Sequence, residues 1–155
     1  MIVYHGTTII VKKPSASYSK RFLDFGVGFY VTSDKKQAEI WAKRKAIRLN
    51  AKPVINVYNL SDDLTSYNGL IFKNEDEKWL DFVADCRSGK DIYKKYGFVS
   101  GSVANDDVFL TVDMYMRGVW DKTRALKEIR YYKSSHQICL ISQALIDNEL
   151  NFVKV

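Results

Sequence analysis

The alternation of hydrophobic and polar positions along the chain predicts short strands interspersed with helices. Runs rich in β-branched and aromatic residues indicate strands, which we expect over Ile2–Gly6, Phe29–Thr32, Pro53–Tyr58, Phe98–Val103, His136–Ile141 and Asn151–Val155. Apolar residues at spacings of three and four indicate helices, which we expect over 35–52, over 74–89, from Asn105, from Asp121 and, as a short turn or helix, over Gln143–Asp147. Two consecutive helices lie between two strands, so this order favours a mixed α+β domain over a doubly wound parallel sheet.

The same pattern predicts where helices start and which faces they bury. Ser33 or Asp34 can cap the first helix, and Asn74–Glu77 resembles a capping box for the second. The stripe that we expect the first helix to bury contains Ala38, Trp41, Ala42, Ala46 and Leu49. The helix after Asn105 is expected to bury Val108, Phe109, Val112, Tyr115 and Met116.

Length and composition indicate a single globular domain over residues 1–155. The chain has 46% hydrophobic and 27% charged residues, as globular proteins do, and no apolar run long enough to span a membrane. The N-terminal segment lacks the basic start and small-residue cleavage site of a secretory signal. We therefore expect a cytoplasmic protein with no membrane partner, in which Cys86 and Cys139 are free, buried thiols.

A net charge of +6 makes an acidic partner a candidate. Much of the excess lies in Lys35–Lys52, where basic residues outnumber the single acid Glu39. The expected apolar stripe leaves Lys36, Lys43, Arg44 and Arg48 mostly outside. A solvated helix face and a nucleic-acid footprint both explain this pattern.

Common catalytic motifs are absent from the sequence. It contains no GxGxxG after a strand, no GxxxxGK[ST], no HExxH, no CxxC and no GxSxG, so dinucleotide-binding Rossmann, P-loop, zinc and α/β-hydrolase functions are unsupported. With only His5 and His136 as histidines, we expect no metal site.

Three strand segments carry the remaining candidate chemistry: Tyr4–Thr7, Gly28–Thr32 and His136–Cys139. Taken alone, His5 is well explained as a core histidine and Tyr30 as a tyrosine that packs a sheet. Together, YHGT, DFGVGFYVT, GSVANDDV and HQICL resemble the diphtheria-toxin and poly(ADP-ribose) polymerase class of ADP-ribosyltransferases. More closely, they resemble an uncharacterised bacterial family usually placed in that superfamily. The resemblance implies a split β-sheet with flanking helices and NAD as co-substrate.

The resemblance also implies roles for individual residues. His5 would hydrogen-bond a ribose hydroxyl, and the Gly6 backbone would pair with the nicotinamide carboxamide. Tyr30 would stack on the cationic nicotinamide ring, whose charge is attracted to an aromatic face. Thr7 and Gly28 complete the expected NAD-binding set, and Gly6 and Gly28 would let the backbone approach a flat ligand closely.

The third position of the triad differs from the pattern of the class. Active members generally carry glutamate where this chain has Gln137, and an amide hydrogen-bonds without supplying negative charge. Asn105, Asp106 and Asp107 are candidates for a nearby acid. A helix N-cap followed by two acids that the helix dipole favours also explains them, and we favour this explanation.

Three functions follow as hypotheses. The first is an NAD-dependent transfer of ADP-ribose to a macromolecular acceptor, with Gln137, Tyr30 and His5 as catalytic residues. The resemblance adds a bacterial toxin or defence role and a small antitoxin-like protein partner. The second is a module that binds NAD or ADP-ribose without catalysis, suggested by Gln137. The third is a basic nucleic-acid-binding protein, suggested by Lys35–Lys52.

Overall fold

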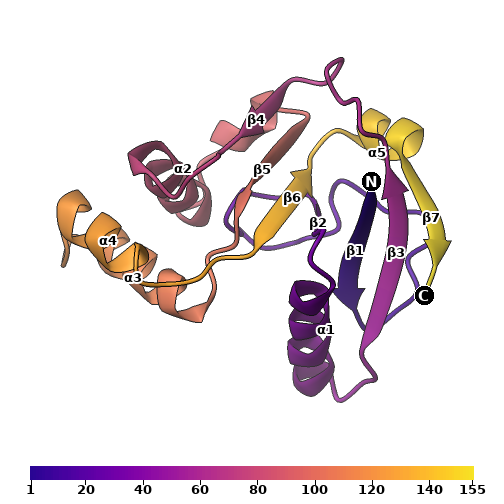
Figure 1. Ribbon diagram of the computed structural model, residues 1–155, viewed down its shortest axis with the longest axis horizontal. Coiled ribbons are helices and arrows are strands. Elements are labelled where there is room, and N and C mark those ends of the chain that lie inside the picture. Colours follow the sequence, from indigo (N-terminus) through magenta and orange to yellow (C-terminus); the bar gives the residue numbers. More distant parts are fainter.

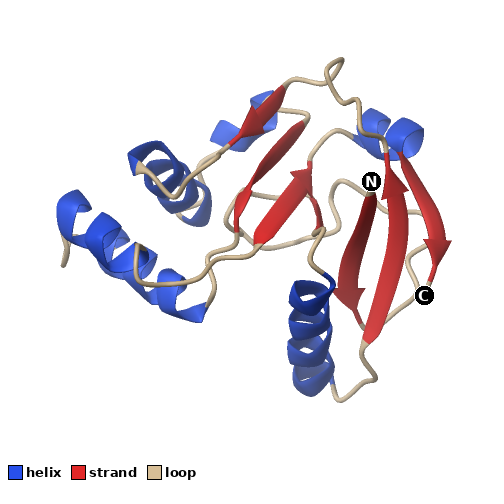
Figure 2. Ribbon diagram, in the orientation of Figure 1, coloured by secondary structure: helices blue, strands red, loops and turns tan.

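Two β-sheets form the centre of the computed structural model, which describes residues 1–155 (Figures 1 and 2). The three-stranded sheet has the order β1 (Ile2–Thr7), β3 (Val54–Leu60), β7 (Leu150–Lys154). The four-stranded sheet has the order β2 (Phe29–Val31), β6 (His136–Leu140), β5 (Phe98–Ser102), β4 (Gly69–Ile71). All neighbouring strands are antiparallel except β4 and β5, which are parallel. The expected mixed α+β architecture is confirmed.

The two sheets meet where β1 passes the end of β2. Tyr4 donates its backbone N–H to Thr32 O at 2.8 Å, and Thr32 donates back to Tyr4 O at 2.9 Å. The Thr32 hydroxyl donates to the carbonyl of His136 on β6 at 2.6 Å. These contacts place the first strand of one sheet beside the edge of the other, so residues of β1, β2 and β6 can face one space.

Five α-helices and one 3₁₀ turn surround the sheets: α1 (Lys35–Leu49), α2 (Glu77–Arg87), the turn Ile92–Lys95, α3 (Asp106–Met116), α4 (Lys122–Ile129) and α5 (Gln143–Glu149). Figure 1 shows α1 beside β1, whereas α2, α3 and α4 gather on the far side of the four-stranded sheet. None of the helices combines the length and the apolar character needed to cross a bilayer.

Each α-helix begins at a side-chain cap. Asp34 caps α1 by accepting from Lys36 N–H, which decides between the two expected residues. Asp76, not Asn74, caps α2 by accepting from Trp79 N–H, so the expected capping box is displaced by two residues. Asn105 caps α3 by accepting from Val108 N–H, as expected. The helix starts are therefore set locally, by one side chain each.

Two hydrophobic clusters fill the interior. One lies among the four-stranded sheet, α2, α3 and α4 and contains Trp79, Leu80 and Phe25; the other lies between the sheets and contains Phe29 and Tyr58. Cys86 and Cys139 are both free and buried, as expected. Burying aromatic and aliphatic side chains in this way is the dominant favourable contribution to folding.

Two expected helix faces need correction. On α3, Phe109 and Met116 are 44% and 37% exposed, and Thr111 is buried instead. The buried face is set by Val108 and Val112, and Thr111 is their neighbour at helical spacing. On α1, Leu49 is 54% exposed, because only the small residues of the stripe reach β1.

Gly6 lets α1 lie directly on β1. A Cβ at Gly6 would overlap the carbonyl oxygen of Ala38 and lie 2.9 Å from the backbone N of Ala42. The neighbours are helix backbone, which cannot move aside as a flexible side chain can. The packing of helix on strand therefore requires glycine here, independently of the close approach of a ligand that the resemblance implied.

We expect Gly6→Ala to destabilise the protein by about 3 kcal/mol or more, because overpacking against backbone forces α1 off the sheet. Gly101→Ala is the matched control, since a Cβ on this second strand glycine would meet only the Phe25 and Phe72 side chains, both at 3.1 Å. Thermal unfolding checks both variants. A loss in Tm for Gly6→Ala no larger than that for Gly101→Ala would contradict this account.

Candidate functional site

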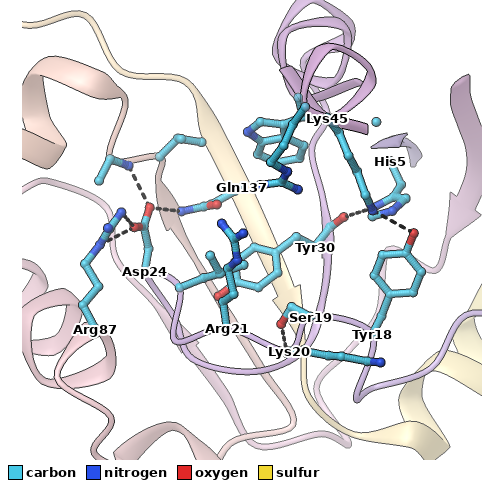
Figure 3. A pocket seen from close by; sticks show the side chains of 17 residues that line it. His5, Tyr18, Ser19, Lys20, Arg21, Asp24, Tyr30, Lys45, Arg87 and Gln137 are labelled. Carbon is cyan, nitrogen blue, oxygen red and sulfur yellow. Dashed lines mark hydrogen bonds and ion pairs between the residues drawn. The ribbon is translucent and has the colours of Figure 1, made fainter. Parts of the chain in front are cut away.

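A pocket of about 510 Å³ opens where the two sheets meet (Figure 3). β1 contributes His5 and Gly6, β2 contributes Tyr30, and β6 contributes Gln137. The loop before β2 and one face of α1 supply most of the remaining wall. Four residues singled out from widely separated sequence segments therefore line one space.

His5 is held in one tautomer at the pocket wall. Its Nδ1 lies 2.7 Å from the carbonyl oxygen of Tyr30, which can only accept, so Nδ1 carries the proton. Nε2 is then an acceptor, and it is buried without a partner. Burial lowers the pKa of His5 to about 4, with Lys45 adding to the shift and the bond to Tyr30 opposing it. His5 is thus a neutral side chain with one unused acceptor.

Tyr30 lines the pocket, and its hydroxyl is hydrogen-bonded within the protein. The hydroxyl donates to Gly26 O at 2.7 Å and accepts from Phe25 N–H at 3.0 Å. Burial raises the pKa of Tyr30 well above its ordinary value, and Cys139 and Asp24 add to the shift. The side chain is therefore a fixed, neutral ring and not a proton donor or nucleophile for a ligand.

Gly6 and Gly28 line the pocket, whereas Gly26 and Thr7 lie outside it and support neighbouring segments. A Cβ at Gly28 would also overlap Cys139 Sγ on β6. Gly26 has φ +83°, a conformation that favours glycine, so this glycine serves the turn before β2. Thr7 is fully buried and does not line the pocket; its hydroxyl bonds Tyr18 OH at 3.0 Å and Lys45 Nζ at 2.9 Å.

Gln137 is buried next to an acid that the sequence reasoning missed. Its Nε2 donates to Asp24 Oδ2 at 2.8 Å and to the carbonyl of Ser102 at 3.3 Å. Asp24 also accepts from Ala104 N–H at 2.9 Å and from the guanidinium of Arg87, whose Nε lies 2.9 Å from Oδ1. A carboxylate that is 5% exposed is thus fully hydrogen-bonded, as buried charges must be.

Asn105, Asp106 and Asp107, the residues considered for a nearby acid, lie at the start of α3 and do not line this pocket. Asn105 caps the helix and lies in a smaller neighbouring hollow. Asp106 forms a two-point ion pair with Arg44, at 2.9 and 2.6 Å, and it is exposed. Asp107 is also exposed. The expectation that one of them supplies charge beside Gln137 is corrected: the acid beside Gln137 is Asp24.

Basic side chains dominate the rest of the pocket wall. Lys20 and Arg21 come from the loop, Lys45 and Arg48 from α1, and Arg87 from α2. Asp24, the one acid among the lining residues, is paired with Arg87. The wall therefore carries a positive excess suited to an anionic ligand. Figure 3 shows Lys45 reaching from α1 toward His5 and Tyr18.

Trp41 adds an aromatic wall on the helix side. It lies on α1 one turn before Lys45 and lines the pocket together with Arg48. The sequence placed Trp41 in the buried stripe of the helix, whereas the structure leaves it half-buried at the pocket. Aromatic surface, a fixed acceptor and surrounding cations together suit a flat, phosphate-bearing ligand.

The loop over residues 18–24 is tied to the strand that follows it. Ser19 N–H donates to Gly28 O at 3.3 Å, and Gly28 N–H donates to Ser19 Oγ at 3.0 Å. Tyr18 packs its ring edge-on against His5 at 5.0 Å between ring centroids. Lys20 and Arg21 are therefore presented to the pocket from an anchored segment.

The missed residues carried weak local signals. Asp24 is the first residue of DFGVGFYVT, but nothing around it in the sequence points to Gln137 or Arg87. Lys45 follows Trp41 by four residues and Arg48 follows Lys45 by three, which places all three on one face of a helix. That spacing could have identified a basic face turned inward.

We expect the burial of neutral His5 to make stability depend on pH. Between its ordinary pKa of 6.5 and its folded value of about 4, the unfolded chain binds a proton that the folded chain does not. Stability therefore falls as the pH falls through this window, by up to about 3 kcal/mol.

Thermal unfolding of the wild type and His5→Asn between pH 7 and pH 4.5 checks this expectation. Asparagine keeps a donor for the Tyr30 carbonyl but does not titrate, so the variant should lose less Tm on acidification. His136, whose pKa burial also lowers, is present in both proteins and cancels in the comparison. Parallel Tm profiles for the two proteins would show that His5 is not the group responsible.

Comparisons with known proteins identify one family. A model of the family described as "Protein of unknown function (DUF3990)" matches residues 1–152. No curated protein and no solved structure matches the chain.

Proposed function

The chain belongs to the DUF3990 family, whose description assigns no activity, and we propose that its pocket binds NAD and transfers ADP-ribose to a macromolecular acceptor. The observation that carries the proposal is the convergence of His5, Gly6, Tyr30 and Gln137 in one basic pocket between two sheets. These are the residues by which the sequence resembles ADP-ribosyltransferases. The arrangement of a three-stranded and a four-stranded sheet supports an ADP-ribosyltransferase-like split sheet.

His5 fits the ribose role because its free atom is an acceptor. A ribose hydroxyl can donate to Nε2, which is otherwise buried without a partner. Leaving a buried acceptor unpaired costs about 1–3 kcal/mol, so a ligand hydroxyl that fills it gains correspondingly. Because the pKa of His5 is lowered to about 4, this acceptor is available at neutral pH.

Tyr30 and the basic wall fit the two charged parts of NAD. The Tyr30 ring offers a face to the cationic nicotinamide, an attraction that is stronger away from water. Lys20, Arg21 and Arg48 line the pocket without acidic partners and can bind the pyrophosphate. When bound, NAD would supply the ADP-ribosyl group and nicotinamide as the leaving group.

Gln137 decides between catalysis and binding alone. Positive charge develops on the ribose as the glycosidic bond breaks, and a nearby acceptor stabilises it. The Gln137 amide accepts through its oxygen without formal charge. If Gln137 does not support cleavage of the glycosidic bond, the same pocket would bind NAD or ADP-ribose without turnover.

NAD binding by calorimetry, with nicotinamide release followed in the same samples, tests the proposal. We expect His5→Ala to weaken NAD binding at least about tenfold, because a buried acceptor interaction is lost. His136→Ala is the matched control, since this second histidine does not line the pocket, and it should leave the affinity unchanged.

Tyr30→Phe and Tyr30→Ala separate stacking from the hydroxyl. Phenylalanine keeps the ring face, so NAD affinity should persist, whereas alanine should remove most of it. Saturable binding with release at background would select the binding module. Failure of well-folded wild-type protein to bind NAD would reject both forms of the proposal.

A nucleic acid is a second candidate ligand, favoured by cations on α1 that lack acidic partners. Lys36 and Lys43 lie two turns apart on one exposed face and form no ion pair. Arg44 contributes less than its charge suggests, because Asp106 neutralises it. A basic face beside the pocket could also guide a nucleic-acid acceptor to a transferase.

We expect any nucleic-acid binding to fall steeply with salt and to be strongly weakened by Lys36→Glu with Lys43→Glu, because phosphate contacts release counterions. Lys127→Glu with Lys154→Glu makes the same change in net charge on other surfaces and should weaken binding far less. Fluorescence anisotropy with a labelled single-stranded oligonucleotide measures both pairs. Equal effects of the two pairs would remove α1 as the binding face.

A further inference from the structure

The hydrogen-bond partners of Gln137 fix which end of its amide faces the pocket. The side-chain nitrogen lies within reach of Asp24 Oδ2 and the Ser102 carbonyl, at 2.8 and 3.3 Å. Both partners are oxygens that accept, so only the NH₂ end can face them. The reversed amide would place oxygen against two oxygens. The orientation therefore follows from the chemistry of the surroundings.

The carbonyl oxygen of Gln137 is left for the pocket. It has no hydrogen-bond partner in the protein, and it is not among the buried unpartnered atoms, which are His5 Nε2 and Trp79 Nε1. Gln137 lines the pocket although only 3% of the residue is exposed. In Figure 3 its nitrogen points to Asp24 and its oxygen points away from Asp24.

Asp24 is itself held firmly in place. Arg87 from α2, Ala104 N–H from the segment before α3, and Gln137 from β6 all donate to its two oxygens. These donors come from three different elements, and the carboxylate is almost fully buried. Asp24 therefore cannot turn away from Gln137 without leaving several buried donors unpaired.

We propose that Asp24 is the positioning residue of this site: it holds the Gln137 carbonyl oxygen toward the pocket and supplies, one hydrogen bond away, the negative charge that a glutamate at position 137 would carry. The proposal rests on the proposed NAD reaction for its functional meaning. A carboxylate that accepts from the amide nitrogen polarises the amide and makes its oxygen a stronger acceptor. Gln137 would thereby accept from a ribose hydroxyl through an oxygen that Asp24 holds in place.

Asp24 also explains why position 137 is glutamine. A glutamate there would place a second carboxyl group at hydrogen-bond distance from Asp24 Oδ2, where the amide nitrogen now lies at 2.8 Å. Two carboxyl groups that share a site cannot both ionise readily, and one of them keeps a proton. The acid at position 24 thus disfavours a second acid at position 137 and favours an amide there.

The other charged and titratable groups around Asp24 and position 137 do not remove the interaction between these two residues. Arg87 from α2 neutralises part of the Asp24 charge, and Lys20, Arg21, Lys45 and Arg48 line the same pocket. Tyr30 from β2 and Cys139 from β6 stay neutral near pH 7, because burial raises the pKa of each. Cys86 from α2 also has a raised pKa, about 12, and His5 is neutral above pH 5.

A double-mutant cycle tests the pair without relying on activity. Tm is measured from pH 5 to pH 8 for wild type, Gln137→Glu, Asp24→Asn and the double variant. We expect the Tm deficit of Gln137→Glu to grow by about 3 °C or more as the pH rises, because both carboxyl groups must then ionise. The same substitution in the Asp24→Asn background should show no such growth, because asparagine can donate to the new carboxylate.

The cycle isolates the pair from other losses. Ala104 N–H loses part of its acceptor in both Asp24→Asn backgrounds, so that cost cancels. Gln137→Met is the control for volume, and its Tm deficit should be independent of pH. If Asp24→Asn does not fold, the contrast between Gln137→Glu and Gln137→Met still shows whether a carboxyl group at this buried position resists ionisation, which the proposal requires. A pH-independent deficit for Gln137→Glu would overturn the proposal.

Nicotinamide release at saturating NAD tests the functional part. We expect Asp24→Asn to lower kcat at least about tenfold with a smaller change in KM, and the double variant to recover part of the loss, because glutamate restores the charge. Asp85→Asn, which removes a partly exposed acid that is paired with Lys90 and does not line the pocket, should leave release unchanged. If the wild type releases nicotinamide and Asp24→Asn is fully active as well, the Asp24 proposal is overturned and the proposed function stands. A wild type that neither binds nor cleaves NAD would overturn the proposed function and, with it, the functional part of this proposal.

Discussion

Paired backbone hydrogen bonds between Tyr4 and Thr32 are the contact on which the rest of the arrangement depends. They join two sheets that otherwise have separate strand partners, and they do so at the point where β1 carries His5 and β2 carries Tyr30. The bond from His5 Nδ1 to the Tyr30 carbonyl lies immediately beside this bridge. The pocket is thus a consequence of how the sheets join, and its walls are strands rather than loops alone.

The electrostatics of the pocket combine a positive wall with one buried negative charge. Water is largely excluded from Asp24, so its interactions with Arg87 and Gln137 are stronger than they would be at the surface. An isolated charge at this depth would be costly, and the three donors to Asp24 offset that cost. The same carboxylate links α2, β6 and the segment before α3, so one group serves both packing and the site.

Local patterns predicted most strands and helices, because spacing, capping and β-branched runs act over a few residues. They missed β4, since three residues that begin with glycine carry little pattern and the strand exists only through its parallel pairing with β5. They also missed Asp24, whose partners Arg87, Ala104 and Gln137 lie 63, 80 and 113 residues away. Residues that match a motif were identified as candidates, whereas a residue defined by distant partners could emerge only from the fold.

Because the chain is synthesised from its N-terminus, the 113 residues between Asp24 and Gln137 also separate the two in time. β1 and β2 emerge first, yet the strand that pairs with β2 and carries Gln137 emerges only after another 113 residues have followed Asp24. Until then Asp24 lacks an amide to orient, and β2 lacks its neighbour in the sheet. A nascent chain therefore stays without a complete pocket until β6 is made, and whatever the pocket does begins only once nearly the whole domain has been translated.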